Sequence, residues 1–126
     1  MFAEQGKVVL TVDALITDEV GRILLIQRGH EPFQGSWVLP GGIVEVGETV
    51  EQACAREVEE EVGLKVDVQG LVGVYSTPGR DPGGAFVSIA FHTSIVGGGL
   101  VTTDEARAHR WLAPEEVLPL GFDHAR

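Results

Sequence analysis

The alternation of apolar and polar residues predicts a chain built mainly of strands, with one long helix. Residues 8–16 (VVLTVDALI) are rich in β-branched residues, and residues 22–28 (RILLIQR) follow them after a turn at 18–21. We expect these two segments to pair as a hairpin. Further strand patterns cover residues 66–76, 85–95 and 106–112. Because there are no repeats and no linker, one domain is expected over residues 1–126.

The helix is predicted over residues 49–62. Thr49 stands three residues before Gln52, the spacing of a capping box in which the two residues satisfy each other's backbone N–H groups. Gly63 favours a helix end because glycine adopts the left-handed conformation at low cost. The apolar stripe of this helix consists of Val50, Ala53, Cys54, Val58 and Val62.

Acidic side chains crowd the last turns of this helix, within the stretch REVEEEVGL at residues 56–64. A helix C-terminus carries partial negative charge and disfavours acid. At about 100° per residue, Glu57, Glu60 and Glu61 share one sector beside the apolar stripe, whereas Glu59 points elsewhere. Two carboxylates about 4 Å apart repel by about 4 kcal/mol at an effective dielectric near 20. A bound divalent cation would relieve this repulsion, and the alternative is a solvated acidic face.

Composition narrows the classes of function. The formal net charge of -10 argues against sequence-independent binding to nucleic acid and against an anionic membrane surface. Cys54 is the sole cysteine, so an intramolecular disulfide and a Cys-rich zinc site are excluded. Residues 2–7 lack the pattern of a signal peptide, and no apolar stretch is long enough to span a membrane. A cytoplasmic protein is therefore expected.

The spacing of these residues resembles the Nudix box, G-x5-E-x7-R-E-U-x-E-E-x-G-U with U aliphatic. The matching positions are Gly42, Glu48, Arg56, Glu57, Val58, Glu60, Glu61, Gly63 and Leu64. The resemblance implies an α/β fold, an α/β/α sandwich around a mixed β-sheet. It also implies hydrolysis of the diphosphate bond in a nucleoside diphosphate linked to another group, and a small-molecule nucleotide as the partner.

The same resemblance assigns roles to individual residues. It implies that Glu57, Glu60, Glu61 and the backbone carbonyl of Gly41 hold two or three Mg²⁺ or Mn²⁺ ions. The general base is implied to be Glu60 or Glu61, or a glutamate on a distal loop. Glu105 occupies the corresponding place on such a loop. An ordinary solvated acid is the alternative for Glu105.

Glu48 and Arg56 resemble a pair that orients the metal-binding carboxylates from behind. The alternative for this pair is an ordinary surface ion pair. Either way, we expect the two side chains to meet.

The substrate is indicated less directly. Pro78 in YSTPGRDPGG and the segment GFDHAR resemble the ADP-ribose pyrophosphatases of this superfamily, which predicts cleavage of ADP-ribose to AMP and ribose 5-phosphate. The candidate substrate contacts are Arg28, Phe33, Arg80, Asp81 and Phe122. The basic and acidic members are expected to contact phosphate or ribose, and the two phenylalanines to stack on the base. A loop salt bridge is the alternative for Arg80 and Asp81.

Two other functions stay open. The box fits a MutT-like hydrolase of nucleoside triphosphates or oxidised nucleotides equally well. A non-catalytic domain that senses ADP-ribose is the alternative from another class. Larger ADP-ribose enzymes dimerise with the help of an added N-terminal region, and this chain begins almost at the first predicted strand. A homodimer is left open.

Overall fold

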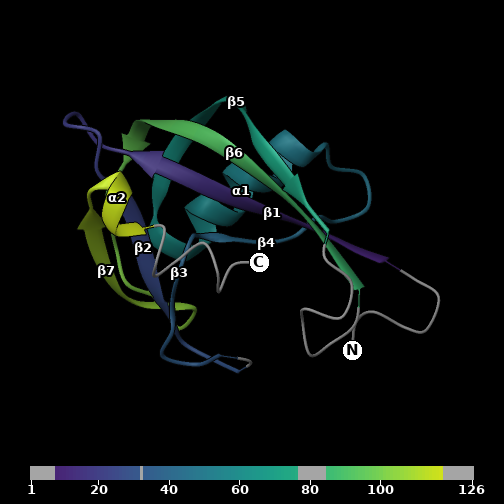
Figure 1. Cartoon of the computed structure of the whole chain (residues 1–126), viewed down its shortest axis with the longest axis horizontal. Helices are drawn as coiled ribbons and strands as arrows, with labels where there is room; N and C mark the ends of the chain where they lie inside the picture. Colours follow the sequence, from purple (N-terminus) through teal and green to yellow (C-terminus); the bar gives the residue numbers. More distant parts are fainter. Residues whose placement is uncertain (1–7, 32, 77–84, 118–126) are drawn as a thin grey trace.

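The computed structural model describes residues 8–31, 33–76 and 85–117 (Figure 1). The described elements are β1 (Val8–Thr17), β2 (Ile23–Arg28), β3 (Trp37–Val38), β4 (Gly41–Ile43), α1 (Val50–Val62), β5 (Leu64–Tyr75), β6 (Ala85–Gly98), β7 (Ala106–Leu112) and α2 (Pro114–Val117). The strands form one seven-stranded sheet whose main path runs β3-β2-β1-β6-β5. Strand β4 pairs with β1, and β7 pairs with β2.

The sheet is mixed. Strand β1 runs parallel to β6 along its whole length, from the pair Val8 and Ala85 to the pair Thr17 and Ser94. The other strand pairs are antiparallel. A parallel pair needs a long crossover connection, and α1 lies within the connection from β1 to β6.

The predicted hairpin of the first two strands is confirmed, since β1 and β2 pair antiparallel across the turn, but the pairing is short. Strands β1 and β2 share a single register pair, Thr17 with Ile23. Further along β1, the edge that faces β2 has other partners. Strand β4 pairs with Thr11–Asp13, and the Ala14 N–H donates to the Pro40 carbonyl. A strand edge holds one partner at a time, so β2 diverges and pairs with β3 and β7 instead.

The helix prediction is confirmed. Thr49 caps α1: its hydroxyl accepts from the Gln52 N–H, and the Gln52 side chain accepts from the Thr49 N–H. Gly63 ends the helix with φ of 80° and donates its N–H to the Glu59 carbonyl. The acid-rich end of α1 therefore lies where the spacing of the sequence predicted it.

An apolar layer lies on each face of the sheet. Helix α1 covers one face and α2 lies on the other (Figure 1). The apolar stripe of α1, with Ala53, Cys54, Val58 and Val62 buried, packs against alternate residues of β1 such as Ile16. On the opposite face, Val117 of α2 joins a second cluster. This arrangement confirms the predicted α/β class with a mixed sheet. Within the described residues, the helices are too short and polar to cross a membrane.

Candidate active site

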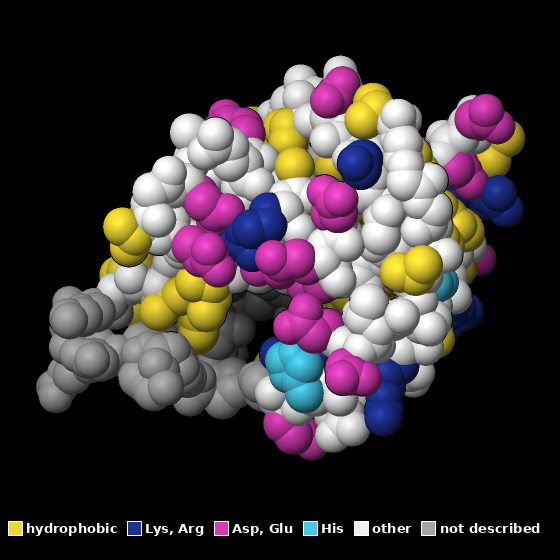
Figure 2. All heavy atoms as spheres, turned by 180° about the vertical axis from the view of Figure 1, so that it is seen from behind, with side chains coloured by type: hydrophobic (Ala, Val, Ile, Leu, Met, Phe, Trp, Pro, Cys, Tyr) yellow, Lys and Arg dark blue, Asp and Glu magenta, His cyan; other side chains and the backbone are white. Residues whose placement is uncertain are grey.

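Three carboxylates converge at the border between α1 and the sheet. Glu57 and Glu61 come from successive turns of α1, and Glu105 comes from the loop before β7. One oxygen from each side chain lies within 4.8 Å of the other two. Figure 2 shows acidic side chains gathered beside a hollow on this face of the molecule. The structure thus brings together three of the predicted site residues, from segments more than forty positions apart.

Glu61 is the most enclosed of these carboxylates, with 6% of its surface exposed. The Gly41 N–H donates to Glu61 Oε1 at 3.2 Å. Burial, followed by the proximity of Glu57, raises the pKa of Glu61 to about 10 in the absence of a metal ion. Burial also raises the pKa of Glu57. Without a cation, this group therefore holds at least one proton at neutral pH.

Gly42 makes room for the Glu57 carboxylate. A Cβ atom at Gly42 would lie 2.5 Å from the carboxyl carbon of Glu57 and 2.5 Å from one of its oxygens. Real side chains do not approach so closely, so any other residue at this position would displace the carboxylate. The glycine of the predicted motif is required here for space.

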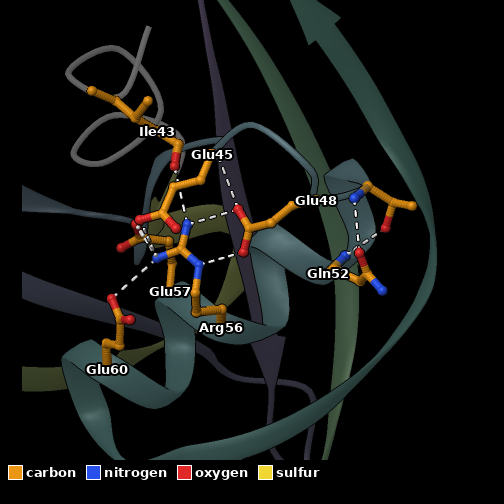
Figure 3. Close-up of polar contacts among 8 residues, drawn as sticks. Ile43, Glu45, Glu48, Gln52, Arg56, Glu57 and Glu60 are labelled. Carbon is orange, nitrogen blue, oxygen red and sulfur yellow. Dashed lines mark hydrogen bonds and ion pairs between the residues drawn. The ribbon is translucent and has the colours of Figure 1, made fainter.

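Arg56 links the acids of this region (Figure 3). Its Nε and Nη2 groups contact the two carboxylate oxygens of Glu48, the second at 3.0 Å. Its Nη1 group donates to Glu57 Oε2 at 3.0 Å and to Glu60 Oε1 at 3.1 Å. The guanidinium holds the pKa of the Glu48 carboxyl below its usual range. Arg56 therefore fixes one oxygen of Glu57, and Glu48 in turn fixes Arg56.

Glu60 lies apart from the three converging carboxylates. Its side chain is 55% exposed and contacts Arg56. The carboxylate group of three consists of Glu57, Glu61 and Glu105 instead. Helical geometry explains the difference, since Glu60 and Glu61 are about 100° apart and flank Glu57 on opposite sides.

The loop that carries Glu105 is held from two directions. The Gly29 N–H donates to the Glu105 carbonyl at 3.2 Å, and a Cβ atom at Gly29 would overlap the Asp104 carbonyl. On the other side, the Thr103 hydroxyl donates to the Glu61 carbonyl at 2.9 Å. These two hydrogen bonds thus hold the loop against the end of β2 and against α1.

The remaining predicted residues divide into two sets. Arg28 is the last residue of β2 and pairs in register with Ala106, the residue that follows Glu105. The backbone of Arg28 therefore lies at the border of the carboxylate group. Phe33 lies in the following loop with a positive φ of 64° and 42% exposure. Positive φ is uncommon for a residue with a bulky side chain. The other candidates lie outside the described residues: Pro78, Arg80, Asp81 and Phe122.

The chemistry of this donor set fits a hard divalent cation. Carboxylate oxygens are the ligands that Mg²⁺ and Mn²⁺ prefer. Three such oxygens lie close enough to share one ion, and burial makes the uncompensated charges costly. Glu57 and Glu61 are held in place by Arg56 and by the Gly41 N–H.

Sequence reasoning missed two residues that shape this site, Thr103 and Gly29. Thr103 also accepts from the Ala106 N–H, three residues on, at 3.1 Å. A threonine that precedes a strand by three residues is a signal for such a turn. Gly29 after a strand could have been interpreted as a close approach of two backbones.

Comparison with known proteins agrees with this geometry. The family model of the NUDIX domain matches residues 7–126. This chain belongs to the Nudix hydrolase family. Arg56, Glu57, Glu60 and Glu61 of the helix, together with Glu48 before it, are therefore the box residues of a Nudix protein.

Similar Nudix proteins have been named for different substrates. An ADP-ribose pyrophosphatase of Methanocaldococcus jannaschii is 44% identical over 93% of this chain and 69% of its own length. A putative 8-oxo-dGTP diphosphatase of Bacillus subtilis is 34% identical over 84% of this chain and 66% of its own length. The chain thus spans about two thirds of both relatives. The crystal structure of a MutT protein from Methanosarcina mazei Go1 has a TM-score of 0.79 and 26% identity, covering 94% of this chain and 86% of that one.

Proposed function

We propose that this Nudix hydrolase cleaves ADP-ribose to AMP and ribose 5-phosphate with a divalent metal ion. The observation that carries the proposal is the convergence of Glu57, Glu61 and Glu105. The choice of substrate is supported by the name of the Methanocaldococcus relative, which is 44% identical over most of the chain. Consumption of one water gives one phosphate monoester on each product.

Within this proposal, Glu57, Glu61 and Glu105 would hold Mg²⁺ or Mn²⁺, and the Gly41 carbonyl would be a further ligand. Such ions would supply positive charge to neutralise the diphosphate and would make water a stronger nucleophile at neutral pH. Arg56 presents Glu57 to the site by fixing its Oε2, and the Gly41 N–H presents Glu61 by fixing its Oε1.

The proton of the attacking water passes to a carboxylate of the same group. We propose Glu61 and Glu105 as candidate general bases, because their carboxylates belong to this group. Glu60, the third candidate, contacts Arg56 at 3.1 Å and is more exposed. Substituting each of the three by glutamine and comparing the pH profile of kcat distinguishes them: loss of the general base removes the acidic limb of the profile.

Binding of the nucleotide is proposed to involve residues on two sides of the carboxylate group. Arg28 contacts a phosphate, because it ends β2 next to the Glu105 loop. Phe33 stacks on the base, since its side chain is 42% exposed. Arg80, Asp81 and Phe122 keep their predicted roles as substrate contacts.

An oxidised nucleotide is the second candidate substrate, because the relatives include proteins named for 8-oxo-dGTP and 8-oxo-dGDP. The carboxylate group suits any diphosphate, so the two candidates differ only in what is attached to it. Competition between ADP-ribose and 8-oxo-dGTP in a single reaction separates them.

The test is a substrate panel with Mg²⁺, with products identified by mass. ADP-ribose, 8-oxo-dGTP, 8-oxo-dGDP and dGTP are compared at equal concentration, with Glu61→Gln as the inactive control. We expect AMP and ribose 5-phosphate from ADP-ribose with the highest kcat/KM. Preferential cleavage of an oxidised nucleotide would replace the proposed substrate. Absence of cleavage across the panel would contradict the enzymatic proposal itself.

A further inference from the structure

The segment of residues 99–103 closes over the C-terminal end of α1, and we call it the helix-end strap. Its bonds to the helix end run from Gly99 N to Gly63 O at 3.2 Å, from Val101 N to Val62 O at 2.8 Å and from Thr103 Oγ1 to Glu61 O at 2.9 Å. The last carbonyls of a helix lack partners within the helix. The strap therefore satisfies carbonyl groups that would otherwise be left without a partner.

Thr103 differs from the rest of the strap because its side chain both donates and accepts a hydrogen bond. The hydroxyl donates to the Glu61 carbonyl and accepts from the Ala106 N–H at 3.1 Å. The Thr103 N–H also donates to the Ala106 carbonyl at 3.0 Å. These bonds close a short turn around Asp104 and Glu105. One hydroxyl thus joins the backbone of Glu61 to the turn that presents Glu105.

From this geometry we infer that Thr103 is a positioning residue, which sets the Glu105 carboxylate against Glu61 through its hydroxyl. The inference rests on the proposed metal site and adds a residue outside the Nudix box to it. Thr103 itself is not a ligand, because its oxygen is engaged by the Glu61 carbonyl and the Ala106 N–H.

Valine has the shape of threonine and lacks the hydroxyl, so Thr103→Val leaves the Glu61 carbonyl and the Ala106 N–H without this partner. The turn then loses its hydroxyl link to α1, and Glu105 is held beside Glu61 only by the remaining bonds of Gly29 and of the strap. Removing groups that orient metal ligands weakens metal binding by about 10–100-fold in other proteins. We expect about a tenfold loss of affinity in this variant.

The experiment measures Mn²⁺ binding to the full chain without nucleotide, by the electron paramagnetic resonance signal of free Mn²⁺. Thr103→Val is expected to bind about tenfold more weakly than wild type, and Thr103→Ser, which keeps the hydroxyl, within twofold of it. Thr102→Val, at an exposed neighbouring position, is the matched control and should bind like wild type. Equal affinity of Thr103→Val and wild type would overturn the inference.

A double variant tests whether Thr103 acts through Glu105. In a Glu105→Gln background the carboxylate is already removed, so adding Thr103→Val should change Mn²⁺ affinity by less than threefold. A full additional tenfold loss would overturn the positioning role. If Thr103→Val does not fold, Thr103→Ala against Thr103→Ser isolates the same oxygen, and equal affinities of those two would overturn the inference. Absence of Mn²⁺ binding to wild type would instead contradict the proposed metal site.

Discussion

Replacing Glu61 by glutamine should stabilise the metal-free protein, and increasingly so as the pH rises. Glu61 is buried beside Glu57, and burial raises its pKa from 4.5 to about 10. Between these two values the folded chain keeps a proton that the unfolded chain has released. Folding then binds protons, so the free energy of unfolding falls as the pH rises. Glutamine keeps the shape and carries no charge at any pH.

The magnitude follows from the number of protons. One retained proton lowers the free energy of unfolding by at most about 1.4 kcal/mol per pH unit. From pH 5.5 to 7.5 the wild type should therefore lose up to about 3 kcal/mol through this carboxyl group. Burial raises the pKa of Glu57 as well, so any contribution of Glu57 to the slope has the same sign. The Glu61→Gln variant should lack the contribution of one proton.

Urea unfolding in EDTA at pH 5.5, 6.5 and 7.5 measures this slope, with the fluorescence of Trp37 and Trp111 as the signal. Glu59→Gln is the matched control, since the Glu59 side chain is 57% exposed on the same helix, and its slope should equal that of wild type. Mg²⁺ should stabilise wild type more at pH 7.5 than at pH 5.5 and have little effect on Glu61→Gln. Identical pH slopes for wild type and Glu61→Gln would refute the reasoning.

Three further predictions concern the surroundings of the carboxylates. Gly42→Ala should fold with little change in Tm and bind Mn²⁺ at least tenfold more weakly by titration, because its Cβ displaces the flexible end of Glu57; unchanged binding would contradict the steric argument. Arg56→Lys keeps the charge and loses the fork of donors, so kcat should fall about 10–100-fold while circular dichroism is unchanged; wild-type turnover would show that the fork is dispensable. Thr49→Ala should cost about 1 kcal/mol in urea unfolding by removing the cap shared with Gln52 and leave kcat unaltered, because the cap lies at the other end of α1.

The acidic helix could be predicted from the sequence because its determinants are local. The cap at Thr49, the apolar stripe and the stop at Gly63 are set by residues within about four positions of one another. These local rules placed Glu57 and Glu61 on the border of the buried face. The motif spacing then indicated the family, which the match over residues 7–126 confirms.

Long-range contacts decided what the local rules left open. From helical geometry, Glu60 and Glu61 were equally good candidates for a metal site with Glu57. In the folded chain the sheet buries Glu61, whereas Glu60 contacts Arg56. The position of Glu105 depends on hydrogen bonds between its loop and two distant segments, one from the Gly29 N–H and one from the Thr103 hydroxyl to the Glu61 carbonyl.

The pairing of β1 was likewise decided by tertiary structure. Beyond the short hairpin with β2, strand β4 pairs with β1 over Thr11–Asp13, and β6 pairs with β1 along its whole length. Strand patterns in a sequence report which residues are buried and leave the neighbouring strand undetermined, because every backbone offers the same donors and acceptors. The sequence by itself determined the helix and its acidic side chains. Which groups contact those side chains was determined only by the tertiary structure, because several of these contacts come from strands and loops distant in the chain.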